Sequence, residues 1–267
     1  MLEIREPAAA GFRLYRLINL SFHRGKFTRA IDLLQLILDL SKQVRQNVWE
    51  ALFLNYLARA KCFVGDYEEA IKECTAAWDK AIEADFPRAQ RDALYIKTQV
   101  YLKMGAIQEA QQTADKLSLF IEGGIFKKII RLFYNLQGKI ELKKKNYPEA
   151  IDHFHKAIAL LNGGPLTHRA DFIESLAQAY YKSGDLEKAR VEYEKISIMT
   201  IGRLSYGAIY ANSFYMLGNI FEQQSKTAKA IENYEKFLEM WRDADSGITE
   251  VENAKKRLAG LKTIKYQ

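Results

Sequence analysis

The sequence predicts an all-α protein, a right-handed α–α superhelix of six helix-turn-helix repeats closed by a C-terminal helix. Alanine recurs about every forty residues, a turn phrase precedes each of these alanines by a few positions, and the apolar residues around each turn follow helical spacing. A fixed period of this length is typical of a solenoid, whose repeats each pack on their neighbours and together present a long surface to partners. The recurring residues are Ala30, Ala70, Ala110, Ala150, Ala189 and Ala230.

The composition fits a folded chain and excludes several classes of protein. Of the 267 residues, 48% are apolar and 27% are charged, and charge interrupts every apolar run well before the roughly 20 residues that a membrane span needs. Charges at Glu3, Arg5 and Glu6 argue against a signal peptide, so a cytoplasmic protein without membrane insertion is expected. The net charge of +7 is more typical of solvated helix faces than of a nucleic-acid site.

The repeats are predicted at approximately residues 11–46, 47–86, 87–124, 125–164, 165–202 and 203–243, after a lead-in of residues 1–10. Each turn joins two helices. Glycines such as Gly65, Gly105 and Gly184 supply the left-handed backbone that ends a helix, and Asp66 or Asp185 can cap the helix that follows. The fourth and sixth turns, residues 145–147 and 225–227, contain no glycine.

Small residues are predicted wherever two paired helices approach closely. Ala58, Gly138, Ala177 and Gly218 on first helices are expected to face the recurring alanines on second helices, because a larger side chain at either point would push the pair apart. Between repeats, Gly and Pro break the second helix at residues 85–87, 122–124 and 162–165. Residues 244–267 are predicted to form a capping helix and a basic tail, with an apolar stripe of Ile248, Val251, Ala254, Leu258 and Leu261.

The repeat phrase resembles the tetratricopeptide repeat family. In that signature a small residue, an aromatic residue three places later, a glycine-containing turn and an alanine follow one another, as Ala177, Tyr180, Gly184 and Ala189 do here. The resemblance covers roughly residues 11–243. The usual repeat of the family has 34 residues, whereas this chain resembles its long, roughly forty-residue kind. HEAT-type repeats share the longer period, but the glycine turn ahead of alanine favours the tetratricopeptide interpretation.

The resemblance implies a concave groove lined by the first helices, with a peptide or protein segment of undefined identity as its ligand. The groove positions hold no aliphatic side chain. Their amides suit a peptide main chain, tyrosine adds contact area, and basic groups can neutralise acidic ones. The alternative is a polar surface that only meets water. These positions, called the first-helix row below, are Tyr15, Asn19, Asn55, Arg59, Tyr95, Gln99, Asn135, Lys139, Glu174, Gln178, Tyr215 and Asn219.

One known use of the family, a carboxylate clamp for a chaperone tail, does not match this chain. The first repeat offers Tyr15 and Asn19 and lacks the lysine, the second has Tyr56 where asparagine is needed, and the third has Asp92 and Ile96 in place of two basic residues. A chaperone-tail adaptor of that type is therefore not expected.

Chemistry-bearing motifs are absent from the sequence. The four histidines are scattered, no phosphate-binding glycine loop or nucleophile motif occurs, and Cys62 and Cys74 are expected to be buried thiols. We therefore expect no cofactor, no metal and no catalytic residue, and a protein that is not an enzyme.

Two further expectations concern the ends of the chain. Residues 234–258 resemble the closing segment of many bacterial multidomain proteins, which implies a bacterial source. The alternative to a free scaffold is thus a regulatory or sensor domain of a larger signalling protein, such as a kinase, a cyclase or a transcriptional activator. The first helix carries Leu14, Leu17 and Leu20 with only a narrow polar strip, so we expect an upstream domain or a second copy of the chain to cover it.

Overall fold

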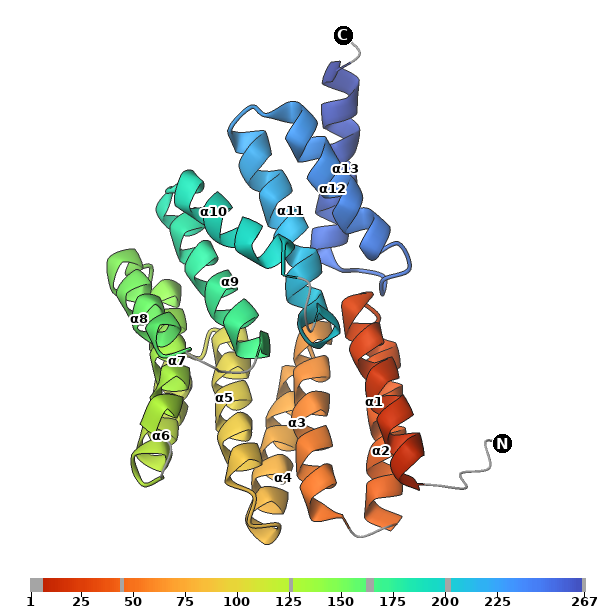
Figure 1. Ribbon diagram of the computed structural model, residues 1–267, viewed down its shortest axis with the longest axis vertical. Helices are drawn as coiled ribbons and strands as arrows, with labels where there is room; N and C mark the ends of the chain where they lie inside the picture. The colour runs from red at the N-terminus through yellow and green to blue at the C-terminus, as the bar shows by residue number, and fades with distance from the viewer. Residues whose placement is uncertain (1–6, 44–45, 125–126, 162–165, 200–202, 266–267) are drawn as a thin grey trace. The chain divides into compact units, whose positions relative to one another are not determined.

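The structure is a computed structural model that describes residues 7–43, 46–124, 127–161, 166–199 and 203–265. Within these ranges there are thirteen α-helices and two short 3-10 helices, and no strand (Figure 1). The all-α prediction is confirmed. The chain divides into two compact units, of which unit 1 comprises residues 1–21 and 27–146 and unit 2 comprises residues 22–26 and 147–267.

Unit 1 is built from antiparallel helices in chain order. From α2 to α7 each helix packs against the next, and α5 also packs against α3 and α7, so first helices of successive repeats touch one another. The bounds are α1 Pro7–His23, whose last two residues belong to unit 2, α2 Phe27–Gln43, α3 Asn47–Val64, α4 Tyr67–Glu83, α5 Pro87–Met104, α6 Ile107–Glu122, the 3-10 helix η1 Lys127–Ile130 and α7 Arg131–Lys143.

Unit 2 follows the same plan. Each helix from α8 to α13 packs against the next, and the first helices α9 and α11 are in contact. Residues 22–26 belong to this unit because Trp241 Nε1 donates to the His23 carbonyl at 3.1 Å and Asp245 N donates to the Gly25 carbonyl at 3.0 Å. The bounds are α8 Tyr147–Ala159, α9 Leu166–Ser183, α10 Leu186–Ser197, the 3-10 helix η2 Arg203–Tyr206, α11 Gly207–Gln223, α12 Thr227–Met240 and α13 Thr249–Lys265.

The recurring alanines lie in the cores of the two units. All six are fully buried, as a position between two closely packed helices requires. Large side chains complete the cores, among them Leu117, Leu136 and Ile140 in unit 1 and Phe154, Tyr193 and Tyr234 in unit 2. The period seen in the sequence is therefore a period of packing.

The structure corrects the predicted partner of Gly218. We expected this glycine of α11 to face an alanine of α12, but a Cβ atom added to it would lie 2.6 Å from Cδ1 of the Tyr234 ring. Tyr234 follows Ala230 by four residues and so lies on the same face of α12. The small residue therefore accommodates an aromatic ring.

The turns adopt the left-handed backbone whether or not they contain glycine. Gly65, Gly105 and Gly184 have φ values of 87°, 81° and 89°, while Lys145 and Ser225 occupy the same place with φ values of 66° and 57°. Capping is less regular than expected. Asp185 accepts a hydrogen bond from the Lys188 backbone N at 3.1 Å, whereas Asp66 makes no side-chain cap. The predicted link at residues 162–165 lies outside the described residues.

The strain at Lys145 leads to a first prediction. A left-handed backbone conformation destabilises the folded state by about 1–2 kcal/mol when the residue has a side chain. Glycine removes this strain, but it also raises the conformational entropy of the unfolded chain, which offsets about 0.4–1 kcal/mol of the gain. Lys145→Gly should therefore stabilise the protein by about 0.5–1 kcal/mol in urea denaturation. The matched control is Gly184→Ala, which meets no atom within 4 Å and should destabilise by about 1 kcal/mol. Shifts of the same sign in both variants would contradict this account of the turns.

The final helix, α13, closes unit 2 as predicted for the capping segment. Its apolar residues Val251, Ala254 and Leu261 are buried, and α13 packs on α12. Ion pairs fix its position, because Arg257 Nη1 lies 3.0 Å from Glu222 Oε2 and Lys262 Nζ lies 2.7 Å from Glu235 Oε1.

The first helix leaves part of its apolar side accessible. Ile18 of α1 is fully buried, whereas Leu17 keeps 39% of its surface exposed. Coverage of this helix by an upstream domain or a second copy stays a prediction.

Candidate functional site

The first-helix row begins in unit 1 with a pair of tyrosines from neighbouring first helices. The hydroxyls of Tyr15 on α1 and Tyr56 on α3 are 3.0 Å apart, and their rings meet edge to face at 5.7 Å. Burial, and then the neighbouring Tyr15, raises the pKa of Tyr56 above its ordinary range. The Tyr56 hydroxyl therefore stays protonated at neutral pH.

Two asparagines of the row are used inside unit 1. Asn19 is buried, and its amide Nδ2 donates to the Tyr15 carbonyl of its own helix at 2.9 Å. Asn55 is buried too and donates to the Ala89 carbonyl of α5 at 3.0 Å, which ties two successive first helices together. These two amides hold helices rather than presenting free groups at the surface.

Further along unit 1, α5 and α7 are connected by four members of the row. The Tyr95 hydroxyl donates to Asn135 Oδ1 at 2.6 Å, and both residues are buried. Next to them, Lys139 Nζ lies 3.4 Å from Gln99 Oε1 and 5.8 Å from the centre of the Tyr95 ring. Lys139 and Gln99 are thus half-buried and lie beside a buried tyrosine–asparagine pair. These contacts restrain the ammonium group of Lys139.

In unit 2 the row crosses from α9 to α11. Asn212 Nδ2 of α11 donates to Glu174 Oε1 at 2.8 Å, while Gln178 is half-buried. Asn219 is buried and accepts from the Tyr234 hydroxyl at 2.9 Å. The ring of the half-buried Tyr215 packs against Phe237 at a centroid distance of 5.4 Å.

The structure thus sorts the first-helix row into two kinds of residue. Five members, Asn19, Asn55, Tyr95, Asn135 and Asn219, are buried, and the bonds of Asn55, Tyr95 and Asn135 connect first helices. The other seven keep accessible surface, namely Tyr15, Arg59, Gln99 and Lys139 in unit 1 and Glu174, Gln178 and Tyr215 in unit 2.

A group of basic residues, three of which the row omitted, lies on the same helices of unit 1. We call Arg59, Arg88, Arg91 and Arg131 the arginine cluster; they come from α3, α5 and α7. Arg88 Nε lies 3.8 Å and Arg91 Nη2 lies 3.7 Å from the carboxylate of Asp92. Sequence reasoning named Arg59 but missed the other three, although Arg91 and Arg131 stand one repeat apart at the same phase.

The pKa values in this region report burial and crowded positive charge. Burial, and then repulsion from Arg88, lowers the pKa of Arg91 although Asp92 opposes the shift. Burial, and then Arg91, likewise lowers the pKa of Arg131. Burial raises the pKa of Asp92, and attraction to Arg91, Arg88 and Arg59 acts in the opposite direction. One carboxylate is thus surrounded by several guanidinium groups.

Features typical of catalytic or metal sites are few in the part of the chain that the structure describes. No group of three or more His, Cys, Asp or Glu residues there is arranged to hold a metal ion. Cys62 and Cys74 are free thiols, and burial raises the pKa of Cys74 to about 12, so its reactive thiolate is suppressed at neutral pH.

Two surface hollows occur away from the first-helix row. One, of about 380 Å³, lies between α11 and α13 and is lined by Glu222, Asn253 and Arg257. The other, of about 280 Å³, lies beside η1 and is lined by Ser118, Phe133 and Tyr134. Neither is lined by a residue of the first-helix row.

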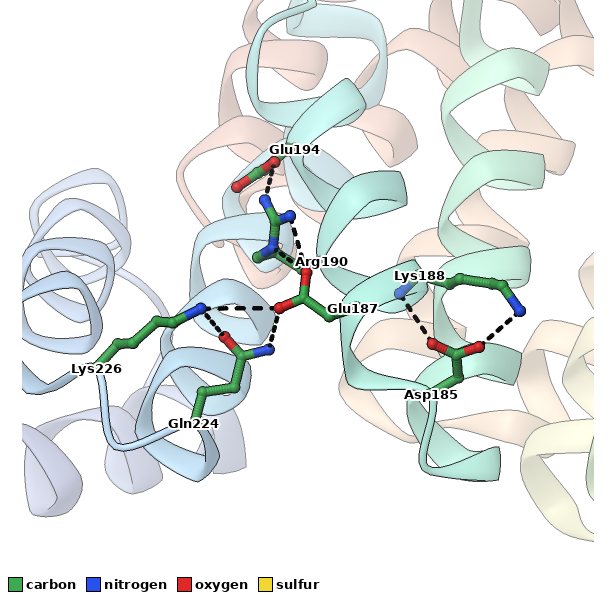
Figure 2. Close-up of polar contacts among 7 residues, drawn as sticks. All are labelled: Asp185, Glu187, Lys188, Arg190, Glu194, Gln224 and Lys226. Atoms are coloured by element: carbon green, nitrogen blue, oxygen red, sulfur yellow. Dashed lines mark hydrogen bonds and ion pairs between the residues drawn. The ribbon is translucent and has the colours of Figure 1, made fainter.

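The second-helix side of unit 2 shows how charges compensate one another elsewhere. Figure 2 shows Glu187 of α10 between Arg190 on one side and Gln224 and Lys226 on the other. Glu187 Oε2 lies 2.9 Å from Arg190 Nη2, and Gln224 Nε2 donates to Glu187 Oε1 at 3.0 Å. Exposed pairs like these contribute little to stability, and every cation drawn has an acidic partner.

Two family models match the chain. Both are described as tetratricopeptide repeat, one over residues 135–198 and the other over residues 211–241. These two parts of the chain are tetratricopeptide repeats. The resemblance stated from the sequence is confirmed, and no curated protein matches the chain as a relative.

Solved structures with the same fold cover most of this chain. A Rap protein complexed with Competence and Sporulation Factor has a TM-score of 0.60 and 18% identity, over 96% of this chain and 78% of that one. The TM-score is 0.53, with 18% identity, for a Signal Transduction ATPase with Numerous Domains that has a tetratricopeptide repeat sensor, from Pyrococcus horikoshii; the match covers 91% of this chain and 37% of that one. BtubC from P. vanneervenii has a TM-score of 0.52 and 15% identity, over 83% of this chain and 90% of that one. At these identities the likeness concerns the fold alone.

None of the helices that the structure describes is long and apolar enough to cross a bilayer. A helical repeat array of this family, with polar side chains along successive first helices, has the architecture of a protein-interaction scaffold.

Proposed function

We propose that this chain is a non-catalytic scaffold that binds a protein or peptide segment in a concave groove lined by the first-helix row. One observation carries the proposal. Half-exposed polar and aromatic side chains of successive first helices are already connected to one another, as in the Tyr15–Tyr56 and Lys139–Gln99 contacts. A segment lying across the repeats would meet ordered donors and acceptors from each helix in turn.

The order of these side chains matters for affinity. Immobilising a flexible side chain on binding costs about 0.5–1.5 kcal/mol, and lysine has much rotamer freedom to lose. Lys139 has lost part of it already, because its ammonium group is held by Gln99 and lies near the Tyr95 ring. The hydrogen bond between buried Tyr95 and buried Asn135 fixes the tyrosine ring beside that ammonium group. A ligand carboxylate or carbonyl would therefore bind there at a reduced entropic cost.

Selection of peptides from a displayed library tests the proposal. We expect peptides that bind the 267-residue chain and that lose at least about tenfold in affinity for the Arg59→Glu/Lys139→Glu variant, since each change replaces an attractive charge by a repulsive one. The matched control is Lys72→Glu/Lys116→Glu, which reverses two exposed charges on the second helices α4 and α6. Equal loss in both variants, or binders that ignore the first, would place the interaction elsewhere.

A regulatory sensor domain is the second candidate. The observation that favours it is the shared fold with a signal-transduction ATPase that has a tetratricopeptide repeat sensor; the match covers 37% of that protein. A sensor must change shape when it binds. Small-angle X-ray scattering with a selected peptide distinguishes the candidates, because a scaffold should keep its radius of gyration and a sensor should alter it.

A further inference from the structure

The arginine cluster of unit 1 has more positive charge than its surroundings neutralise. Arg59, Arg88, Arg91 and Arg131 come from three first helices, and Asp92 is the carboxylate that pairs with Arg88 and Arg91. This excess positive charge does not come from mobile lysines at the surface. The Arg91 side chain is only 15% exposed and Asp92 only 28%, whereas Arg88 reaches out with 65% of its side chain accessible.

Asp92 does not saturate the donors around it. Its two ion-pair distances, 3.8 Å and 3.7 Å, are longer than the 2.7–2.9 Å of a charge-assisted hydrogen bond. Each guanidinium has five N–H donors. Among the described residues, the buried Nε atoms of Arg91 and Arg131 have no hydrogen-bond partner. These two atoms are out of reach of solvent, so the donors open to a further anion are those of the exposed Arg88 and the half-buried Arg59.

The charged group of unit 2 in Figure 2 provides the contrast. There Arg190 lies between Glu187 and Glu194, Lys188 pairs with Asp185, and Lys226 reaches Glu187. That arrangement is complete without a ligand. The arginine cluster lacks such compensation, so it has the charge balance of a binding surface rather than of a solvated helix face.

We propose that the arginine cluster binds side-chain carboxylates of an acidic peptide segment, with two acidic residues spaced at i and i+3. This inference rests on the proposed function and names the chemistry of its ligand. Packed helices lie about 8–10 Å apart, and one turn of a polyproline II segment, three residues long, spans about 9 Å and returns to the same side, so carboxylates with this spacing match guanidiniums from neighbouring first helices. Planar guanidinium groups also pair with carboxylates through two parallel hydrogen bonds.

The neighbouring groups favour a peptide over a nucleic acid. The hydroxyls of Tyr15 and Tyr56 lie near the cluster, since Arg59 and Arg88 act electrostatically on Tyr56. Such neutral donors suit peptide carbonyls. Asp92 stands among the arginines and would repel the closely spaced phosphates of a nucleic-acid strand more than two separated carboxylates.

Fluorescence anisotropy with the full chain tests the proposal. The probe is a short labelled peptide of Gly, Ser and Tyr with an amidated end and two Glu residues at i and i+3; its comparison peptide has Gln in both places. We expect the Glu peptide to bind at least about tenfold more tightly than the Gln peptide, and to weaken at least about tenfold with Arg59→Gln/Arg88→Gln. Lys72→Gln/Lys116→Gln is the matched control and should change its affinity less than twofold.

Asp92→Asn gives a test of opposite sign. If Asp92 competes with the ligand for the guanidiniums, its neutral isostere should bind the Glu peptide about threefold or more tightly. A merely structural role predicts equal or weaker binding. Circular dichroism and thermal melts show that each variant is folded before its affinity is compared.

Other probes separate the remaining outcomes. A peptide whose single carboxylate is its free C-terminus should bind no better than the Gln peptide; tighter binding than the Glu peptide would assign the cluster to chain ends. Tighter binding of a single-stranded RNA, lost with the same arginines, would overturn the proposal in favour of a nucleic acid. Library binders that need Arg59 and Lys139 but show no acidic preference would overturn this inference and leave the proposed function standing. A library without binders would remove both.

Discussion

Replacing Tyr234 with alanine is expected to lower the free energy of unfolding by about 3–5 kcal/mol, the usual cost of deleting a buried aromatic side chain. Tyr234 is fully buried in unit 2, with its ring against Gly218 of α11. Its hydroxyl oxygen lies 2.9 Å from Asn219 Oδ1 and 2.7 Å from Glu222 Oε2. The alanine variant loses the ring contacts, opens a cavity between α11 and α12, and leaves the buried Asn219 oxygen without this donor.

Urea denaturation followed by circular dichroism measures the total loss, and hydrogen exchange locates it. Repeat proteins lose cooperativity when one interface weakens, so amides of α11 and α12 should exchange faster than those of unit 1. The control is Tyr234→Phe, which keeps the ring and removes the hydroxyl. We expect it to cost about 1–3 kcal/mol, mainly for the unsatisfied acceptor on Asn219. Equal stability of the two variants would show that the ring contributes nothing beyond its hydrogen bond.

The helical repeat could be predicted from sequence because it depends on local signals. An alanine such as Ala110 must be small wherever two helices meet, and a turn must adopt a left-handed backbone whether Gly105 or Lys145 occupies it. Such demands recur with every repeat, so a periodic pattern records them. The pattern assigns Gly218 to the helix interface but does not show which side chain of α12 it meets, because that depends on how far one helix is displaced along the other.

The candidate site was predictable only to the level of a helix face. Helical spacing placed Asn55 and Asn135 on the first-helix row, yet both are buried, because neighbouring first helices approach closely enough to enclose them. This burial depends on the side-chain volumes of adjacent repeats, which cannot be read from the sequence of one repeat alone. The other three arginines of the cluster were missed for a different reason. Arg88 and Arg91 lie near the start of α5, ahead of the positions that the family uses, and the repeated arginine at residue 131 was the available signal.

Gly218→Ala should destabilise the native protein and stabilise the Tyr234→Ala variant. In the native background a Cβ atom at residue 218 would lie 2.6 Å from the Tyr234 ring, and overpacking of this kind costs about 1–3 kcal/mol. Alanine recovers about 0.5–1 kcal/mol of that loss as the better helix former, which leaves a net cost of about 0.5–2 kcal/mol. Without the ring there is no overpacking, and only the gain from the better helix former remains. The same substitution should then raise stability by about 0.5–1 kcal/mol.

A double-mutant cycle measures this reversal, with urea midpoints for the native chain, both single variants and the double variant. The gain in the Tyr234→Ala background arises because glycine loses more backbone freedom on folding than alanine does. Gly260 of α13 provides the matched control, because a Cβ atom there meets no atom within 4 Å. Gly260→Ala should therefore stabilise both backgrounds alike. If Gly218→Ala instead costs the same with and without the tyrosine ring, the close approach of α11 to α12 is not what requires glycine at this position.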